Sequence, residues 1–265
     1  MTHALVFDSG VGGLSVAAEL RALMPDLYLT YVADDEFRPY GAKTEAQLKT
    51  RLPGLLQTLV LAVKPDCVVL ACNTASTTAL REIREVLDIP VIGVVPAVKP
   101  AALQSVTKTI AVLGTPGTVQ RKYVDELIKA HARDCHVILR GSEILVALAE
   151  DKLAGRPVSK VHMRAEIAPM FAAKRGDEID TVVLACTHFP LLLDELMAAA
   201  PRGINWIDSG AAIARRTKSV LTNIQQNGAP AMPQTALLIG GKNDAARAQM
   251  FGRFGFEKTI ALSGY

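Results

Sequence analysis

The sequence predicts an α/β protein of two similar domains, each a mostly parallel sheet flanked by helices, pseudo-symmetric and with the functional site expected between them. Short apolar runs rich in β-branched residues alternate with helical stretches along nearly the whole chain, which is typical of parallel sheets. The phrase Val-Val-Leu-Ala-Cys also occurs twice, ending at Cys72 and again at Cys186. This repeat indicates a duplicated fold with equivalent cysteines.

The apolar runs and their spacing place the individual elements. Strands are predicted at 4–7, 27–32, 67–71, 91–94, 110–113, 135–139, 181–185 and 204–207. Helical spacing of apolar and small residues predicts helices at about 13–23 and 74–87. Pro53 lies inside a further helical segment, 44–63, and predicts a break that divides it in two.

Two boundaries divide the predicted domains, although no low-complexity linker separates them. The first lies at the proline-flanked segment 96–100, and the second lies around 207–210. The phrase Asp-Ser-Gly at 208–210 repeats the one at 8–10, and each follows an apolar run and precedes a helix of small residues. We therefore expect the chain to return to its first domain, which comprises 1–97 plus 208–265, while 98–207 form the second.

Composition excludes several classes of function. The 265 residues are 50% hydrophobic and 21% charged, and the net charge is +3 with Lys and Arg spread along the chain, which argues against nucleic acid as the primary partner. No apolar run reaches the roughly 18 residues of a membrane span. The start enters a strand directly, without the pattern of a signal peptide, and four scattered cysteines make no disulfide framework. We expect a cytoplasmic protein without a membrane partner; the oligomeric state is left open, and a homodimer is compatible with the sequence.

Cys72 and Cys186 are the first candidates for chemistry. Each ends a predicted strand, at the carboxyl edge where α/β sheets bind ligands. Each precedes a predicted helix, whose N-terminus can lower the pKa of a thiol. The alternative is that both are small core residues, which is how we interpret Cys67 and Cys135 near their strand starts.

Polar residues follow both cysteines. Asn73 and Thr74 come after Cys72, and Thr187 and His188 come after the second cysteine. A histidine beside a thiol can move protons or hold charge. A zinc site is a weaker interpretation, because the close-spaced ligand pair typical of zinc is missing, and we expect no metal.

Three loops supply further candidates. The glycine-rich segment 8–13 could hold a phosphate or let backbone approach a small ligand, although its spacing is not that of the dinucleotide fingerprint. Asp8 there either orients a substrate ammonium or tunes a thiol, or it caps the next helix. Pro-Tyr-Gly at 39–41 is either a loop over the site or a plain β-turn. Thr115 and Thr118 open the second half in the same way and could bind a carboxylate.

With these motifs the sequence closely resembles glutamate racemases, within the aspartate/glutamate racemase superfamily. The resemblance covers nearly the whole chain, and as a set its motifs are specific. They are the segments 7–14, 39–41, 71–74, 114–119 and 185–191. The Pro-Tyr-Gly and Cys-Thr-His-Phe-Pro-Leu elements favour the glutamate branch.

The resemblance implies roles for individual residues. Cys72 and Cys186 would be the catalytic acid/bases, with Asp8 and His188 assisting proton transfer. Glu150 is a further candidate near the site, with a solvated helix residue as the alternative. The substrate would be lined by Asp8, Ser9, Tyr40, Gly41, Asn73, Thr74, Thr118, Thr187 and His188.

The chemistry that follows is racemisation of glutamate without a cofactor, by two thiols on opposite faces of one carbon. Such an enzyme would supply D-glutamate for peptidoglycan synthesis. Three alternatives stay open from the sequence. They are a racemase for aspartate or another amino acid, a non-catalytic binding protein, and an enzyme that uses pyridoxal phosphate.

Overall fold

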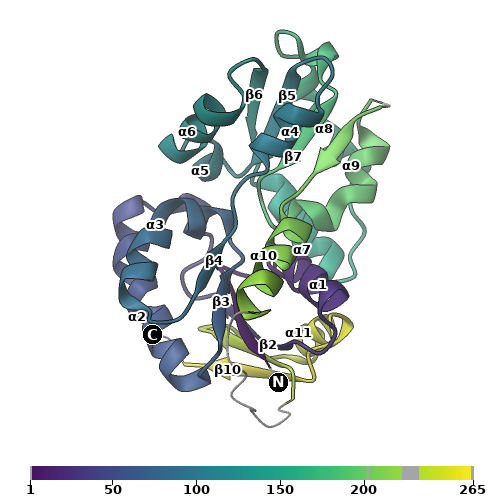
Figure 1. The fold of residues 1–265 in the computed structure, drawn as a ribbon. Helices are drawn as coiled ribbons and strands as arrows, with labels where there is room; N and C mark the ends of the chain where they lie inside the picture. The colour runs from purple at the N-terminus through teal and green to yellow at the C-terminus, as the bar shows by residue number, and fades with distance from the viewer. Residues whose placement is uncertain (1, 202, 223–232, 264–265) are drawn as a thin grey trace. The chain divides into compact units, whose positions relative to one another are not determined.

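The computed structural model describes residues 2–201, 203–222 and 233–263, and the chain divides into two compact units. The first unit comprises Met1–Val94 and Gly210–Tyr265, and the second comprises Val95–Ser209. Each unit is built around one parallel sheet with helices packed on it (Figure 1). The predicted α/β fold with two parallel sheets is confirmed.

The first unit contains a six-stranded sheet in the order β10-β9-β2-β1-β3-β4, and all its strand pairs are parallel. Every residue of β1 and β2 is buried, so helices must cover both faces. Helices α2 and α3 cover one face, and α1, α10 and α11 cover the other (Figure 1). Its elements are β1 (His3–Asp8), α1 (Leu14–Leu23), β2 (Tyr28–Asp34), η1 (Tyr40–Ala42), α2 (Glu45–Val63), β3 (Cys67–Leu70), α3 (Asn73–Val86), β4 (Val91–Gly93), α10 (Gly210–Thr222), β9 (Thr235–Ile239), α11 (Ala245–Arg253) and β10 (Lys258–Leu262).

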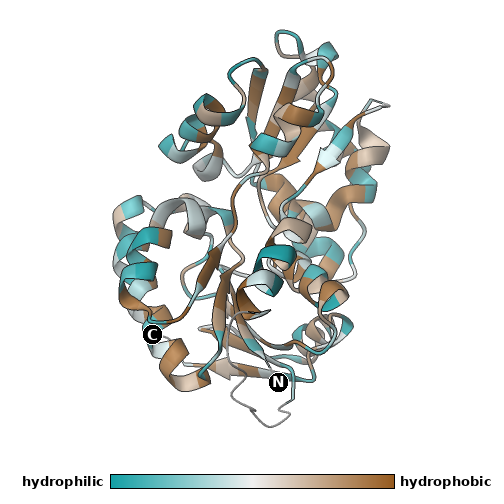
Figure 2. Cartoon of the chain, viewed as in Figure 1, coloured by the Kyte–Doolittle hydropathy of each residue, from teal (hydrophilic) through white to brown (hydrophobic). Residues whose placement is uncertain are grey.

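The second unit contains a four-stranded parallel sheet in the order β6-β5-β7-β8. This order matches β2-β1-β3-β4 of the first unit, so β7 is the equivalent of β3. The central strands of both sheets are apolar (Figure 2). Its elements are α4 (Val98–Gln104), β5 (Thr109–Gly114), α5 (Pro116–Val119), α6 (Lys122–His131), β6 (His136–Gly141), α7 (Ile144–Leu153), α8 (Lys160–Phe171), η2 (Gly176–Glu178), β7 (Thr181–Leu184), η3 (Phe189–Leu192), α9 (Leu193–Ala199) and β8 (Asn205–Ile207).

The predicted break at Pro53 is wrong, because α2 runs unbroken through it. The proline removes the hydrogen bond to the carbonyl of Lys49, but Lys49 is exposed and water can reach that carbonyl. On both sides of the proline, leucines such as Leu48 and Leu56 enter one core cluster with β1 and β3. Their burial outweighs a helix penalty of about 3 kcal/mol.

The described structure also contains two strands, β9 and β10, that lie beyond the last predicted strand. They extend the first sheet on the side of β2. Most of β10 is exposed, and only its last three residues are apolar. Within the described ranges, no helix has the length and apolarity needed to traverse a lipid bilayer.

Candidate active site

The first group of candidate residues gathers at the carboxyl edge of the first sheet. Strands β1 and β3 are parallel neighbours, and the N–H of Ala71 extends their pairing by donating to the carbonyl of Phe7 (2.8 Å). Asp8 at the end of β1 and Cys72 just after β3 therefore lie side by side. We call Asp8, Ser9, Cys72, Asn73 and Thr74 the Cys72 group; all except the half-buried Ser9 are at most 5% exposed.

Cys72 is the N-cap residue of α3, and its thiol donates to the hydroxyl of Ser9 (3.7 Å). The expectation that the helix N-terminus lowers its pKa is wrong for this structure. Burial, followed by the negative charge of Asp8, raises the pKa of Cys72 to about 12, and donors such as the Ala75 N–H offset this only in part. The protein alone therefore keeps this sulfur a thiol.

Asp8 is fully buried, and its Oδ2 accepts a hydrogen bond from the N–H of Gly10 (3.0 Å). Burial raises its pKa to about 6, against the N–H groups of Gly13, Gly10 and Ser9 and the Cys72 thiol, which all lower it. Asp8 therefore changes charge near neutral pH, which suits a group that assists proton transfer. The alternative of a helix cap is not what the structure shows, since the N-cap of α1 is Gly13 and no side chain caps it.

Asn73 and Thr74 form the first turn of α3. The Oδ1 atom of Asn73 is buried, and none of the described residues offers it a hydrogen bond. Because the two ends of an amide are interchangeable by a flip, this position can present either an acceptor or a donor to a ligand. An unsatisfied buried polar atom at a ligand-binding edge is a feature of a site that a ligand completes.

The Pro-Tyr-Gly loop forms one turn of 3₁₀ helix, η1, after β2. Tyr40 is 1% exposed, and its hydroxyl donates to Oδ2 of Asp34 (2.6 Å), which also accepts from Nε of Arg51 (2.8 Å). Tyr40 packs in the same core cluster as Cys72. The proton of its hydroxyl is thus used in a hydrogen bond within the protein. Asp34 and Arg51 were not among the candidates predicted from the sequence, although Asp34 ends a strand as Asp8 does.

The second group lies at the carboxyl edge of the second sheet. Ala185 extends the pairing of β7 with β5 by donating to the carbonyl of Leu113 (2.7 Å), and Cys186 follows. The sulfur of Cys186 lies 3.8 Å from Nδ1 of His188, and both residues are buried. We call Thr118, Cys186, Thr187, His188 and Glu150 the Cys186 group.

Glu150 reaches His188 from a helix, and Thr118 follows the neighbouring strand β5. Oε1 of Glu150, on α7, lies 3.9 Å from Nε2 of His188, so a protonated imidazole would form an ion pair with it. This contact favours a site role for Glu150 over that of a solvated helix residue. Thr118 is fully buried in α5, directly after β5, and its Oγ1 is 2.9 Å from Oγ1 of Thr115. Thr187 lies between Cys186 and His188 in the turn that leads to η3.

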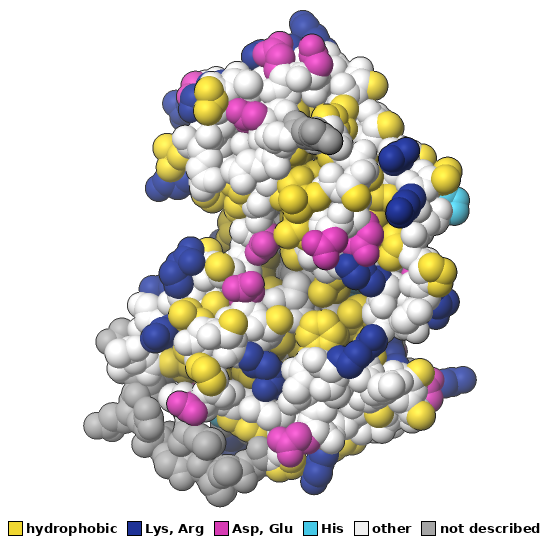
Figure 3. Space-filling view, turned by 90° about the vertical axis from the view of Figure 1, so that its right-hand side faces the viewer, with side chains coloured by type: hydrophobic (Ala, Val, Ile, Leu, Met, Phe, Trp, Pro, Cys, Tyr) yellow, Lys and Arg dark blue, Asp and Glu magenta, His cyan; other side chains and the backbone are white. Residues whose placement is uncertain are grey.

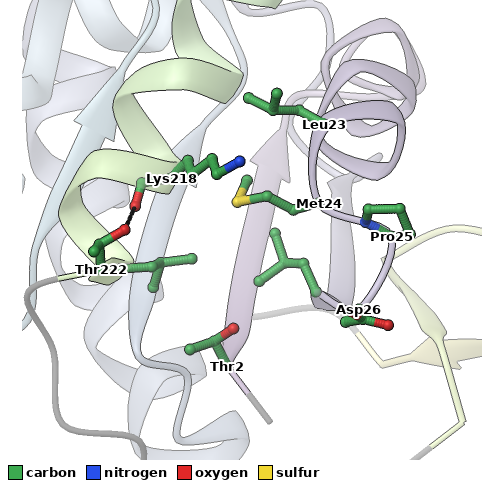
Figure 4. Close-up of a pocket in the computed structure, with 9 residues that line it drawn as sticks. Thr2, Leu23, Met24, Pro25, Asp26, Lys218 and Thr222 are labelled. Atoms are coloured by element: carbon green, nitrogen blue, oxygen red, sulfur yellow. Dashed lines mark hydrogen bonds between the residues drawn. The ribbon is translucent and has the colours of Figure 1, made fainter.

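A surface hollow in the first unit lies away from the Cys72 group. It has a volume of about 310 Å³ and is lined by residues that include Thr2, Met24 and Lys218 (Figure 4). Thr2 precedes β1, so the hollow is at the opposite edge of the sheet from Asp8. Among the described residues no cluster of His, Cys, Asp and Glu is arranged to hold a metal ion. On the face shown in Figure 3, Lys and Arg side chains are scattered.

Comparison with known proteins decides the family. The model of the family described as Asp/Glu/Hydantoin racemase matches residues 14–217. The chain belongs to this family. It is therefore an enzyme, an isomerase of the racemase type, and the interpretation as a non-catalytic binding protein is not supported.

The relatives are similar over almost their full length. The chain is 43% identical to a glutamate racemase of Agrobacterium fabrum over 95% of this chain and 92% of that protein, and 44% identical to one of Mesorhizobium japonicum over 95% and 96%. The structure of Escherichia coli glutamate racemase, in complex with L-glutamate and the activator UDP-MurNAc-Ala, superposes with a TM-score of 0.92 at 41% identity, covering 99% of this chain and 98% of that one. An aspartate racemase homologue of Pyrococcus horikoshii, at 15% identity and a TM-score of 0.51, shares the fold alone.

Proposed function

We propose that this racemase interconverts L- and D-glutamate without a cofactor, with Cys72 and Cys186 as its two acid/bases. One observation carries the proposal: equivalent strands of the two sheets each lead to a buried cysteine, and each sulfur lies beside a second group that can exchange protons. The similarity to glutamate racemases supports glutamate as the substrate. In a bacterium such an enzyme would work in the cytoplasm and supply D-glutamate for peptidoglycan synthesis.

The reaction breaks the Cα–H bond of one enantiomer and forms a Cα–H bond on the opposite face. In the forward direction one cysteine, as thiolate, takes the α-proton, and the other, as thiol, gives its proton to the carbanion-like carbon. The charges are conserved, since one thiolate is consumed and one is produced. In the reverse direction the two cysteines exchange roles.

The high pKa of Cys72 is consistent with this chemistry. A thiolate that is desolvated and near a carboxylate is a strong base, and it needs a compensating positive charge to form. The substrate ammonium group would supply that charge when it binds next to Asp8 and Cys72. Proton removal is then coupled to the presence of substrate, which limits reaction of the thiolate with other molecules.

Substrate binding would use the polar atoms around each cysteine. In the Cys72 group, Ser9, Asn73 and Thr74 offer hydroxyl, amide and backbone N–H groups to a carboxylate. Thr118 and Thr187 offer their side-chain hydroxyl groups in the Cys186 group. We further propose substrate contacts from Tyr40 and Gly41; the proton of the Tyr40 hydroxyl is already donated to Asp34, which favours contacts from backbone N–H groups of this loop.

The test is circular dichroism of L-glutamate incubated with purified, reduced protein and no added cofactor, with proton NMR in D₂O in parallel. We expect the optical signal to decay to zero and deuterium to enter at the α-carbon. Turnover of aspartate but not of glutamate would reassign the substrate. Activity that requires added pyridoxal phosphate would overturn the cofactor-free mechanism.

A further inference from the structure

A buried tyrosine outside the proposed site contacts the loop that carries Asp8 and Ser9. Tyr31 lies on β2, directly opposite Val6 of β1, and is fully buried. Its hydroxyl donates to the carbonyl of Gly10 (2.9 Å). The N–H of the same Gly10 donates to Oδ2 of Asp8 (3.0 Å). One residue of backbone thus connects the phenol to the carboxylate.

The space for this arrangement is made by Gly13. A Cβ atom at position 13 would lie 2.9 Å from the Tyr31 hydroxyl oxygen and 2.9 Å from Cβ of Asp8. These distances are too short for any side chain. Glycine therefore lets the phenol pass beneath the loop and reach Gly10. The ring of Tyr31 packs against Phe251 and Phe256, with centroids 5.5 and 5.7 Å away.

We propose that Tyr31 is a positioning residue of the Cys72 group: its hydroxyl holds the Ser9–Gly10 turn so that the Gly10 N–H stays on the Asp8 carboxylate beside Cys72. This inference rests on the proposed function for its catalytic meaning. It assigns Tyr31 no contact with substrate. Loss of the Tyr31 hydroxyl would weaken the hydrogen bond from the Gly10 N–H to the Asp8 carboxylate, and the pKa of Asp8 would then rise.

The charged and titratable groups around this link are few. Asp8 faces the Cys72 thiol and the phenol of Tyr31, whose pKa is raised well above its ordinary value by burial and then by Asp8, Asp35 and Cys72. Asp35 is itself paired with Arg247 and with Nε of Arg38 (3.4 Å). The phenol therefore stays neutral and keeps donating throughout the range in which Asp8 titrates.

The chain offers a matched control on the same strand. Tyr28 also donates its hydroxyl to a carbonyl, that of Pro233 (2.6 Å), at the start of β2 and far from Asp8 along the strand. Tyr31→Phe removes one oxygen atom from a buried hydrogen bond, and Tyr28→Phe removes one from a partly buried hydrogen bond. Both are expected to lower thermal stability, so stability alone does not discriminate between them.

The experiment is the pH profile of kcat/KM for the unmodified enzyme, Tyr31→Phe and Tyr28→Phe. In Tyr31→Phe the acid limb should move to higher pH by about one unit, because Asp8 loses part of a hydrogen bond to its charged form. In Tyr28→Phe the limb should not move. A Tyr31→Phe enzyme with an unchanged limb would overturn the proposal and leave Tyr31 a purely structural residue.

A second readout does not require racemisation. The rate of Cys72 alkylation, followed by mass spectrometry of the Cys72 peptide, should show a step where Asp8 ionises, and Tyr31→Phe should move that step upward. If glutamate is not racemised, the proposed function fails while this measurement still judges the role of Tyr31. If Tyr31→Phe does not fold, the unmodified protein is labelled with ¹³C at the hydroxyl-bearing carbon of tyrosine. The NMR signal of Tyr31 is then followed as Asp8 titrates, and it should shift over the same pH range. A Tyr31 signal that does not shift as Asp8 titrates would contradict the proposed connection from Tyr31 through Gly10 to Asp8.

Discussion

The Cys72 group and the Cys186 group end equivalent strands, yet a different partner lies beside each sulfur. Cys72 has a buried carboxyl group, Asp8, which arrives from the neighbouring strand. Cys186 has an imidazole, His188, which lies two residues further along its own turn, with Glu150 behind it. Duplication of the fold thus preserved the position of the cysteine but not the group that assists it.

The segments after the two cysteines differ as well. Cys72 caps a 14-residue helix directly, whereas Cys186 is followed by a turn and the short helix η3, and α9 begins only at Leu193. A helix was predicted after each cysteine and one follows each of them, but only after Cys72 does it begin at the next residue. The turn after Cys186 is what brings His188 back toward the sulfur. The two cysteines are thereby accompanied by different assisting groups, a carboxyl group beside Cys72 and an imidazole beside Cys186.

The largest effect is expected from removing either sulfur. Cys72→Ala and Cys186→Ala should each lower racemisation by about 10³-fold or more, because each removes one of two obligatory proton carriers. Circular dichroism of both enantiomers measures this, and far-ultraviolet spectra check the fold. Cys67→Ala is a control, since it removes a buried thiol at the start of β3. Near-normal turnover in Cys72→Ala would disprove the two-base mechanism.

Replacing the assisting groups Asp8 and His188 should distinguish proton transfer at Cys72 from proton transfer at Cys186. Asp8→Asn and His188→Asn should each lower kcat/KM by about 10²-fold, as expected for a group that assists proton transfer. Because the equilibrium constant of a racemisation is one, kcat/KM must fall equally in both directions. The distinction should therefore be in the isotope effect.

We expect Asp8→Asn to raise the primary α-deuterium isotope effect for one enantiomer and His188→Asn to raise it for the other. Competition between α-deuterated and unlabelled L- and D-glutamate measures it. Equal isotope effects for both enantiomers in both variants would show that the two assisting groups do not serve separate cysteines.

The burial of Asp8 should also be visible in stability. Its pKa is raised to about 6 in the folded state, so its contribution to stability is lost as pH rises from about 4 through 6. Asp8→Asn should therefore be more stable than the unmodified protein by up to about 3 kcal/mol at pH 8, and no more stable at pH 3. Urea unfolding at the two pH values tests this. If Asp8→Asn is instead less stable than the unmodified protein at pH 8, the hydrogen bonds to the Asp8 carboxylate outweigh the free-energy cost of its burial.

The smallest effect is expected from glycines near the two groups in the sequence. Gly13→Ala should cost about 1–3 kcal/mol, because the new Cβ would lie 2.9 Å from both Asp8 Cβ and the Tyr31 hydroxyl. Gly114→Ala, at the end of β5, should cost less, since its nearest neighbour is a methyl group of Val119 at 3.1 Å. Gly10→Ala has no atom within 4 Å of the new Cβ and is the neutral control. Thermal unfolding ranks the three, and a Gly114→Ala cost above that of Gly13→Ala would contradict the difference in packing.

Much of the fold was predictable because its strands are apolar on both faces. Such runs are long enough to recognise in the central strands, and β3 and β7 begin where predicted. Two strands near the C-terminus were missed. Edge strand β10 is mostly exposed and begins with Lys258 and Thr259, so its apolar run is short. Strand β9 carries the apolar run Ala-Leu-Leu-Ile, and it was not assigned from the sequence. Pro53 shows the reverse error, because a local rule was overridden by the burial of leucines far apart in the sequence.

By itself, the sequence determined the class of the fold, the repeated cysteines and the polar residues that follow them, because these are local patterns in neighbouring residues. Only the tertiary structure decided that Asp8 adjoins Cys72, that Glu150 reaches His188, and that Tyr31 and Asp34 hold two of the predicted loops. It also reversed the expected pKa of Cys72, because burial and a charge from another strand outweigh a helix terminus. Such effects depend on distance in space and on exclusion of water, and neither can be read from the order of residues.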